Sequence, residues 1–392
     1  MKTKLRSFIT FTFILVGIVC FSACDLISII SPINTNSKKI VYDMQFGWNL
    51  GNTLDAHYGE KNNNIGLSTE TCWGQPETTQ AMIKGLAKSG IKTIRIPVSW
   101  HNHVLDNNYT IDSAWMARVK EIVNWAIAED MYVILNIHHD NSKTYGFFPS
   151  SEYKTESLKY LTGIWKQIAD NFNNAYDEHL VFEMMNEPRL VDDEHEWDFQ
   201  SSCETCIDCM NCVNEFNQEC LDVIRSSGGN NAKRLVMFPA IAASPDSAFN
   251  ELFKIPEDSA EEALALSVHM YTPYPFAMGV DINSNSDFTE LDKSILDYYF
   301  STLNEKFVSK GIPVVIGEMG ATNKDNLKDR EEWFEYFVKQ SRKYGIASCL
   351  WDNGNPEPST TESERYGYYD RENAQWYFPS LIEIAVEAAK TE

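Results

Sequence analysis

Short apolar segments alternate with longer amphipathic stretches along the chain from about residue 41 onward. Apolar runs that end at Gly, Pro, Asn or Asp are typical of strands buried on both faces of a parallel sheet. They predict eight strands, at Phe46–Leu54, Thr93–Val98, Tyr132–His138, Leu180–Asn186, Arg234–Pro239, Ala265–Met270, Pro313–Glu318 and Ala347–Trp351. The amphipathic stretches predict helices at Glu77–Ser89, Ile111–Glu129, Glu156–Asn171, Val213–Ser226, Leu291–Lys310, Arg330–Tyr344 and Leu381–Lys390.

Strands that alternate with helices in a single row predict an α/β fold, a (β/α)8 TIM barrel. We expect one catalytic domain over residues 40–392. An open doubly wound sheet is the alternative, but no Gly-rich phosphate loop follows the first strand.

Two of the apolar runs end at glutamates. Leu180-Val-Phe-Glu-Met-Met-Asn-Glu187 is followed by Pro188, and Pro313-Val-Val-Ile-Gly-Glu318 is followed by Met-Gly. The carboxyl ends of the strands form the active-site face of a barrel, so acids there favour chemistry over packing. A lone strand-end glutamate is often only an ion-pair partner, whereas a pair is what glycoside hydrolysis requires.

Other polar and aromatic residues stand at or just after the predicted strand ends. They are Asn49, Asn52, Trp73, Arg95, His138, His139, Asn186, His269, Tyr271 and Trp351. His138-His139-Asp140 suggests a metal, but no further ligand has suitable local spacing. We therefore expect neither a metal nor a cofactor at this face. Trp48 is expected in the core, and Trp100 and Trp376 stay open between core and site.

Several motifs together resemble one enzyme family. They are Gly47-Trp-Asn-Leu-Gly-Asn-Thr-Leu-Asp55, Arg95-Ile-Pro-Val98, Asn136-Ile-His-His139, Asn186-Glu-Pro188 and Ile316-Gly-Glu318. In this order they resemble glycoside hydrolase family 5, in its branch of endoglucanases, lichenases and xyloglucanases. The resemblance runs from about residue 40 to the C-terminus. It implies a retaining endo-acting β-1,4-glucanase (a cellulase) that also cuts mixed-linkage β-glucan or xyloglucan.

The resemblance also implies roles for the strand-end residues. Glu187 corresponds to the acid/base, with a pKa expected to be raised by burial and by the second carboxylate. Glu318 corresponds to the nucleophile, held ionised by Arg95 and oriented by Tyr271. Asn186 would bind the sugar 2-hydroxyl, His269 would lie beside Glu187, and His138 would contact sugar hydroxyls. Trp351 would form the stacking floor under the sugar at the cleaved bond. The remaining substrate-binding residues would be Trp73, Asn49, Asn52 and His139.

The charge balance narrows the choice of partner. The formal net charge of −23 disfavours a nucleic-acid partner, because most of the surface would repel phosphate. A neutral β-glucan polysaccharide is not repelled, and aromatic residues, 12% of the chain, suit both a core and sugar stacking. We expect a monomer.

The N-terminus has the pattern of a targeting segment. Lys2, Lys4 and Arg6 precede an apolar stretch over residues 8–19, and small residues precede Cys24. This pattern predicts a signal peptide over residues 1–23, of lipoprotein type, with a lipid anchor on Cys24. Residues 24–39 are expected to form a tether. The protein would then be secreted or lipid-anchored at the cell surface.

A run of cysteines departs from the family pattern. Cys203, Cys206, Cys209 and Cys212 follow one another at a spacing of three residues, and Cys220 lies beyond them. In a cytosolic protein this spacing would suggest an iron–sulfur or zinc site. A signal peptide favours disulfides instead. Cys72 and Cys349 are able to approach each other if the first and last strands are neighbours.

Three other functions remain as alternatives. The first is a family 5 hydrolase of another β-linked backbone, such as mannan, because loop shape decides the backbone. The second is a catalytically dead barrel that binds glycans at the cell surface, although Glu187, Glu318, Arg95 and Tyr271 are intact. The third is a metal or redox module built from the cysteines.

Overall fold

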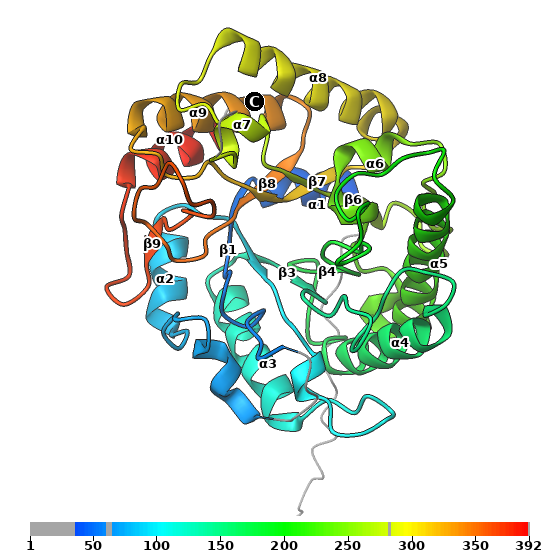
Figure 1. Ribbon diagram of the computed structural model, residues 1–392. Coiled ribbons are helices and arrows are strands. Elements are labelled where there is room, and N and C mark those ends of the chain that lie inside the picture. Colours follow the sequence, from blue (N-terminus) through cyan, green and yellow to red (C-terminus); the bar gives the residue numbers. More distant parts are fainter. Residues whose placement is uncertain (1–35, 60–64, 281–283, 391–392) are drawn as a thin grey trace, which may run out of the picture.

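The fold is a closed barrel of parallel strands surrounded by helices (Figure 1). The computed structural model describes residues 36–59, 65–280 and 284–390. Strand β1 pairs with β2 on one side and with β8 on the other, which closes the barrel. The strands are β1 (Phe46–Asn49), β2 (Thr93–Ile96), β3 (Tyr132–Asn136), β4 (Leu180–Glu183), β5 (Val236–Pro239), β6 (Leu264–Met270), β7 (Val314–Met319) and β8 (Ala347–Leu350). The predicted (β/α)8 barrel is confirmed, and the open sheet is excluded.

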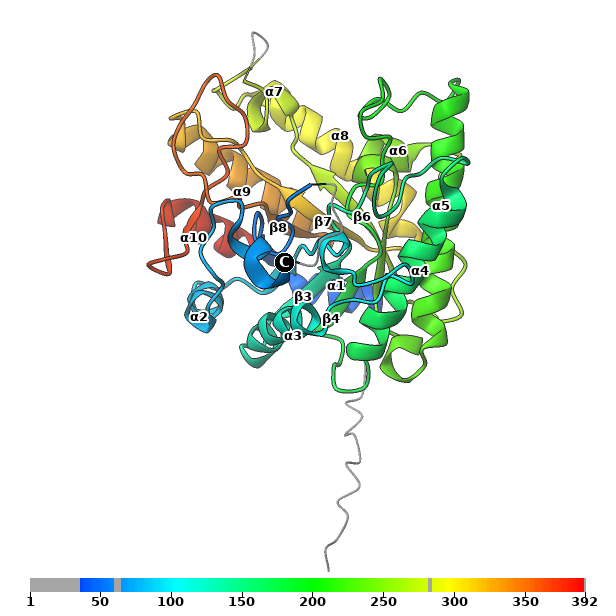
Figure 2. The same ribbon diagram turned by 60° about the horizontal axis from the view of Figure 1, so that its bottom comes forward.

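The helices form a ring around the barrel, with neighbours in sequence side by side, as α4 and α5 are in both views (Figures 1 and 2). The α-helices are α1 (Ser37–Met44), α2 (Gln80–Lys88), α3 (Ser113–Ala128), α4 (Lys154–Asn171), α5 (Glu204–Ser226), α6 (Pro245–Phe249), α7 (Tyr274–Ala277), α8 (Glu290–Lys306), α9 (Leu327–Lys343) and α10 (Pro379–Ala389). Helix α5 begins well before the expected start at Val213, so Cys206, Cys209 and Cys212 are helical and Cys203 is the N-cap residue. The short strands β9 (Tyr369–Asp370) and β10 (Gln375–Trp376) form a separate hairpin.

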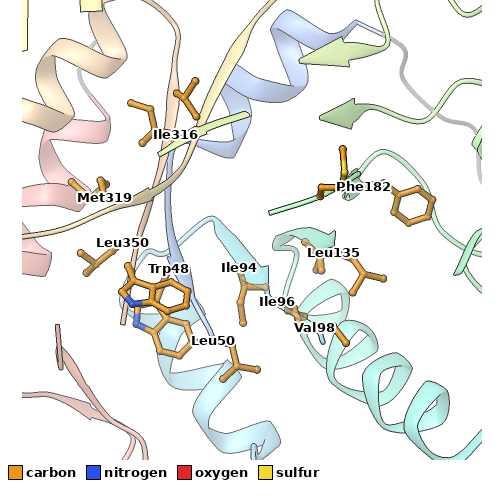
Figure 3. Close-up of a cluster of buried hydrophobic side chains, with 14 of the residues drawn as sticks. Trp48, Leu50, Ile94, Ile96, Val98, Leu135, Phe182, Ile316, Met319 and Leu350 are labelled. Carbon is orange, nitrogen blue, oxygen red and sulfur yellow. The ribbon is translucent and has the colours of Figure 1, made fainter. Parts of the chain in front are cut away.

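Alternate side chains of each strand point outward into the core between barrel and helices. Figure 3 shows part of this core, where Trp48, Ile94 and Ile96 contribute from β1 and β2. Trp48 is 1% exposed, which confirms its place in the core. Every residue of the eight barrel strands is buried, as a sheet covered on both faces requires.

The inward-facing side chains change from apolar to polar along the barrel axis. Near the amino ends of the strands, Ile134, Val181, Met237 and Val315 form an apolar layer. Helix α1 adds Ile40, Val41 and Met44 to the same cluster. Two residues further along the strands the inward positions become polar, with Asn136 following Ile134 and Glu183 following Val181. The barrel is therefore closed by α1 at one end and polar at the other.

The N-terminal predictions fall mostly outside the described residues, since the signal peptide and Cys24 precede residue 36. The last residues of the expected tether, from Ser37 onward, belong to α1, and the Ser37 N–H donates to Glu262 O at 2.9 Å. Within the described residues, no helix combines the length and apolarity needed to cross a bilayer.

The seven cysteines of the described residues are all free thiols, so the expectation of disulfides is wrong for this structure. Cys349 lies in the apolar layer inside the barrel, whereas Cys72 caps the short 3-10 helix Gly66–Thr71 in the loop after β1. Adjacent strands therefore do not bring these two sulfurs together. The remaining cysteines are fixed along α5, where the helix directs them to different surroundings.

Candidate active site

Both glutamates of the predicted pair lie at the polar end of the barrel. Glu318 belongs to β7, and Glu187 follows the end of β4. The pairing of β6 with β7 shifts register after Val268, so that His269 stands opposite Glu318. Such a bulge re-aims the side chains beyond it. Three strands thereby direct titratable groups into one space.

Arg95 is the centre of the site. Its guanidinium is fully buried and lies against five side chains that come from β1, β4, β6 and β7 or the residues just after them. Nε donates to Glu183 Oε2 at 2.8 Å, and Nη1 donates to Glu318 Oε1 at 2.8 Å and to Asn49 Oδ1 at 3.0 Å. Nη2 donates to Asn186 Oδ1 at 2.6 Å, and His269 Nε2 lies 3.4 Å from Nη2. Burial acts to lower the pKa of Arg95, but the charges of Glu183 and Glu318 raise it. Arg95 therefore carries a permanent positive charge between two carboxylates.

Glu183 is a buried partner that sequence reasoning missed. It lies within the apolar run of β4 and is 0% exposed. Ser267 donates to its Oε1 at 2.5 Å, and Asn136 donates to its Oε2 at 2.9 Å. The only signal in the sequence was one acid inside an otherwise apolar strand. Because a buried carboxylate needs a counter-charge, that acid indicated a buried cation, which is Arg95.

Glu318 is held from two sides. Arg95 donates to Oε1, and the Tyr271 hydroxyl donates to Oε2 at 2.8 Å. Burial raises the pKa of Tyr271 well above its ordinary value, with the nearby negative charge of Glu318 adding to the effect, so the phenol remains a donor. Each oxygen thus has a fixed donor, and the carboxylate has one orientation.

Glu187 is paired with His269, whose Nδ1 lies 2.7 Å from Glu187 Oε1. Arg189 Nη1 lies 3.6 Å from Oε2. Burial raises the pKa of Glu187, but the hydrogen bond and charge of His269 outweigh it, so the pKa falls to about 2. The pKa of His269 is raised despite its burial, because Glu318 and Glu187 face it. The expectation of a raised pKa for Glu187 is therefore wrong for the free protein, because the hydrogen bond and charge of His269 outweigh the effect of burial.

The two glutamates are close enough to act on one bond. Glu187, His269 and Glu318 each have a polar atom within 4.8 Å of the others. Carboxyl groups of inverting glycosidases stand roughly 6.5–9.5 Å apart, whereas those of retaining enzymes stand about 5–5.5 Å apart. The nearest approach of the two carboxyl groups, within 4.8 Å, is compatible with the retaining arrangement.

His138 and Trp351 form one wall beside the carboxylates. Their rings are parallel, with centroids 5.8 Å apart and an interplanar angle of 3°. Burial lowers the pKa of His138 well below its ordinary value, aided by the charges of His139 and Arg95, so the ring is neutral. Asn136 Nδ2 lies 3.2 Å from His138 Nδ1, which fixes the ring. The wall offers a neutral hydrogen-bonding edge next to an indole face.

A second group of predicted residues lies farther along the same face. Trp73 is 38% exposed, and its ring centroid lies 5.5 Å from that of His139. His139 Nε2 lies 3.6 Å from Asp55 Oδ2. Asn52 and Trp73 line a cavity of about 390 Å³ that also includes Asn353. Neither Glu187 nor Glu318 lines this cavity.

Asn49 was predicted to bind substrate, and the structure places it elsewhere. It is 0% exposed, donates to Gly317 O at 2.9 Å and accepts from Arg95. Its amide therefore braces Arg95 and β7 and does not face the cleft. Trp100 and Trp376 are also structural, because Trp100 Nε1 donates to Asn136 O at 3.0 Å and Trp376 Nε1 donates to Ser89 Oγ at 2.7 Å.

Two side-chain clusters at this face have metal-ligand chemistry. One is the pair of glutamates with His269, and the other is Asp55 with His138 and His139. The first is already satisfied by Arg95, Tyr271 and internal hydrogen bonds. In the second, His138 is oriented by Asn136 and stacked on Trp351. Both clusters therefore have partners that account for their geometry.

A parallel eight-stranded barrel with two close glutamates after β4 and on β7, one of them bound to a buried arginine, defines a glycoside hydrolase. Comparison with known proteins agrees. Residues 56–357 match the model of the cellulase family, glycosyl hydrolase family 5. The chain belongs to glycosyl hydrolase family 5.

Relatives cover almost the whole described chain. Endoglucanase B of Ruminococcus albus is 40% identical over 366 residues, which are 91% of this chain and 82% of the relative. A family 5 lichenase mutant from Caldicellulosiruptor sp. F32, solved with cellotetraose, is 41% identical, with a TM-score of 0.86 and coverage of 92% and 97%. A broad-specificity endoglucanase from Ruminococcus champanellensis with bound cellotriose is 38% identical, with a TM-score of 0.83 and coverage of 91% and 100%.

Proposed function

We propose that the protein is a retaining endo-β-1,4-glucanase that hydrolyses cellulose-type chains, with mixed-linkage β-glucan and xyloglucan as further substrates. Family membership supports the reaction class. The relatives named endoglucanase or lichenase, two of them solved with cello-oligosaccharides, support a β-glucan substrate. The observation that carries the mechanism is the separation of Glu187 and Glu318, within 4.8 Å.

In the first step, Glu318 attacks the anomeric carbon and forms a glycosyl-enzyme. Its carboxylate must be ionised, and the hydrogen bonds from Arg95 and Tyr271, both 2.8 Å, favour the ionised form. These donors also aim one oxygen at the sugar. As the bond to the leaving sugar breaks, the glycosidic oxygen takes a proton from Glu187.

The proton for that step is stored on the pair of Glu187 and His269. In the free enzyme the proton resides on His269, whose Nδ1 lies 2.7 Å from Glu187 Oε1. Transfer along this hydrogen bond gives a neutral Glu187 and a neutral His269 without any change in the proton count of the pair. Such coupled groups titrate together, so the pair acts as one acid.

In the second step, Glu187 is a carboxylate and takes a proton from water, which attacks the glycosyl-enzyme and releases Glu318. Two displacements at the same carbon retain the β configuration. Asn186 is proposed to contact the sugar 2-hydroxyl. Because its Oδ1 accepts from Arg95, its amide nitrogen is the group that donates to the sugar.

The substrate is proposed to lie along the wall and cavity beside the carboxylates. Trp351 and His138 would bind the sugar at the cleaved bond, and Trp73, His139 and Asn52 would bind sugars farther along the chain. Indole and imidazole faces suit the apolar faces of sugar rings, and their polar edges suit hydroxyls. A cleft with several such contacts fits cleavage within a polymer.

We further infer that the protein is a monomer exported by its N-terminal segment, with Cys24 as a lipid-anchor site. The basic residues, the apolar stretch and the small residues before Cys24 support export and the anchor site. Expression of the full chain in a bacterium, with labelled fatty acid, tests it. Label on the wild type and none on Cys24→Ala is the expected result, and equal label on both contradicts it.

One experiment tests reaction, mechanism and nucleophile together. Purified residues 25–392 are assayed on carboxymethylcellulose, mixed-linkage β-glucan, xyloglucan, xylan and mannan, with Glu318→Gln as the blank. The anomer formed first is identified by proton NMR. A 2-fluoro cellobioside with a good leaving group then traps the glycosyl-enzyme, and peptide mass spectrometry locates it.

We expect rapid viscosity loss on the glucans, a β product and a label on Glu318. Cleavage of mannan alone would keep the mechanism and overturn the substrate. An α product would overturn the retaining mechanism. Binding of β-glucan without cleavage of any polymer would support the catalytically dead surface-binding barrel instead.

A further inference from the structure

Three metal-binding side chains that the proposed reaction does not use lie together near the start of α5. His195 comes from the loop after β4, Cys203 precedes the first residue of α5, and Cys206 lies in its first turn. One ligand atom of each lies within 4.8 Å of the others. His195 did not stand out in the sequence, because the chain must fold back before it meets the cysteines.

Local hydrogen bonds hold these groups close together. Cys203 caps α5, and its sulfur accepts a hydrogen bond from the Cys206 N–H at 3.4 Å. Backbone N–H groups at a helix start favour a negatively charged sulfur, which is the form that binds metals. Cys206 is 2% exposed, and Asp193 Oδ1 accepts from the His195 N–H at 2.9 Å, which fixes the turn that carries the imidazole.

Helix α5 separates the remaining cysteines from this cluster. Cys209 packs with Met210 and Val213 in a small apolar cluster, while Cys212 and Cys220 belong to the main core. Burial raises the pKa of Cys209, so its thiol stays protonated at neutral pH. The run of four cysteines is therefore not one four-ligand site, and the iron–sulfur option loses its ligand set.

We propose that His195, Cys203 and Cys206 bind a Zn²⁺ ion. Two thiolates and an imidazole are a common protein ligand set for zinc, with water in the fourth position. Zinc–ligand bonds of about 2.0–2.3 Å place tetrahedral ligand atoms roughly 3.5–3.8 Å apart. The three ligand atoms, now within 4.8 Å of one another, would have to approach to that spacing on binding. On binding, the two thiols release their protons to solvent.

The ion would brace a loop that reaches the catalytic pair. Glu196, next to His195, accepts hydrogen bonds from Arg189 Nε at 2.9 Å and from the Asp192 N–H at 3.1 Å. The Arg189 guanidinium lies 4.3 Å from the centre of the exposed Trp197 ring and also faces Glu187. A metal at His195 would join this loop to α5.

The competing chemistry is a disulfide between Cys203 and Cys206, which would consume both thiolates. The two are distinguished on tag-free protein purified in a phosphine reductant. Bound metals are measured by mass spectrometry, and zinc affinity is measured by competition with a chromogenic chelator. Cobalt substitution adds a thiolate-to-cobalt charge-transfer absorption. The variants are Cys203→Ala, Cys206→Ala and His195→Ala, with Cys209→Ala as the matched control from the same helix and spacing.

We expect about one zinc per chain in the wild type and in Cys209→Ala. Loss of either liganding cysteine should weaken zinc binding at least 100-fold and abolish the cobalt charge-transfer band, since each thiolate is a direct ligand. Failure of the reduced wild type to bind added zinc would overturn the proposal, as would equal binding by Cys203→Ala. A Cys203–Cys206 disulfide that persists when zinc is supplied would overturn it too. If a variant fails to fold, the wild-type competition and cobalt spectrum still decide.

Discussion

Replacement of Arg95 by methionine tests how far one buried cation supports both the fold and the chemistry. The guanidinium is the counter-charge of two carboxylates, Glu183 and Glu318, and both contacts are 2.8 Å long. Removal of one partner of a buried ion pair costs about 3–5 kcal/mol, because the other charge stays buried without compensation. We therefore expect Arg95→Met to lower the free energy of unfolding by about that amount.

The same change should also lower the rate constant of the folded enzyme. Glu318 would keep Tyr271 but lose its charged donor, and Asn186 would lose its fixed orientation. Loss of one preorganised electrostatic contact typically lowers kcat by about 10²–10³-fold. Urea unfolding followed by tryptophan fluorescence gives the stability, and kcat/KM on an aryl β-cellobioside, corrected for the folded fraction, gives the activity.

Arg234→Met is the matched control. Arg234 is also 0% exposed, but it donates to backbone carbonyls, among them Leu180 O at 2.7 Å, and makes no contact with either catalytic glutamate. It should lose stability while its folded fraction keeps full activity. The double variant Arg95→Met with Glu183→Gln should regain part of the stability but none of the activity, because Glu318 still lacks its donor. An Arg95→Met enzyme as active per folded molecule as Arg234→Met would refute the reasoning.

Three further changes address single contacts in the site. In the wild type, the raised pKa of His269 keeps a proton on the pair of Glu187 and His269 to a pH above the ordinary histidine value of 6.5. In His269→Gln, Glu187 must hold this proton alone. The alkaline limb of kcat/KM should therefore move to lower pH, and an unmoved limb contradicts the proton pair. Tyr271→Phe should lower kcat by roughly tenfold or more, since a hydrogen bond to a charged group contributes about 1.5–3 kcal/mol; an unchanged kcat would remove Tyr271 from the mechanism. Trp73→Ala should raise KM on long cello-oligosaccharides by roughly two- to tenfold, for a lost stacking contact of about 0.5–1.5 kcal/mol, and leave aryl cellobioside kinetics unchanged. Equal effects on both substrates would indicate that Trp73 acts on structure.

The barrel was predictable because its strands are apolar on both faces. The residues at which the strands end were not predictable. The first strand was expected to reach Leu54 and ends at Asn49. Beyond it, Asp55 accepts N–H groups from Asn52 at 3.0 Å and Thr53 at 2.7 Å, and Asn52 takes a positive φ of 54°. A side chain that satisfies the backbone locally ends a strand without any change in hydrophobicity.

The glutamates could be found from sequence because chemistry at a strand end leaves a polar residue where packing needs none. The roles of Glu183 and Asn49 could not be assigned from the sequence, because both depend on hydrogen bonds from Arg95, which lies on a different strand. The predicted direction of the pKa shift of Glu187 was wrong for the same reason. Burial can be inferred from the neighbours in the chain, whereas the charge of His269 comes from a different strand.

The amino-terminal helix determines which way the cleft would face on a membrane. Helix α1 covers the end of the barrel opposite to the glutamates, so the described chain enters the fold at the end away from the active site. A lipid on Cys24 would anchor the enzyme at the end of the barrel that α1 covers. The active-site cleft would then face away from the membrane, toward polymers outside the cell. Vesicle-bound enzyme is therefore expected to hydrolyse soluble β-glucan as fast as the free enzyme, and a marked slowing on vesicles would contradict this orientation.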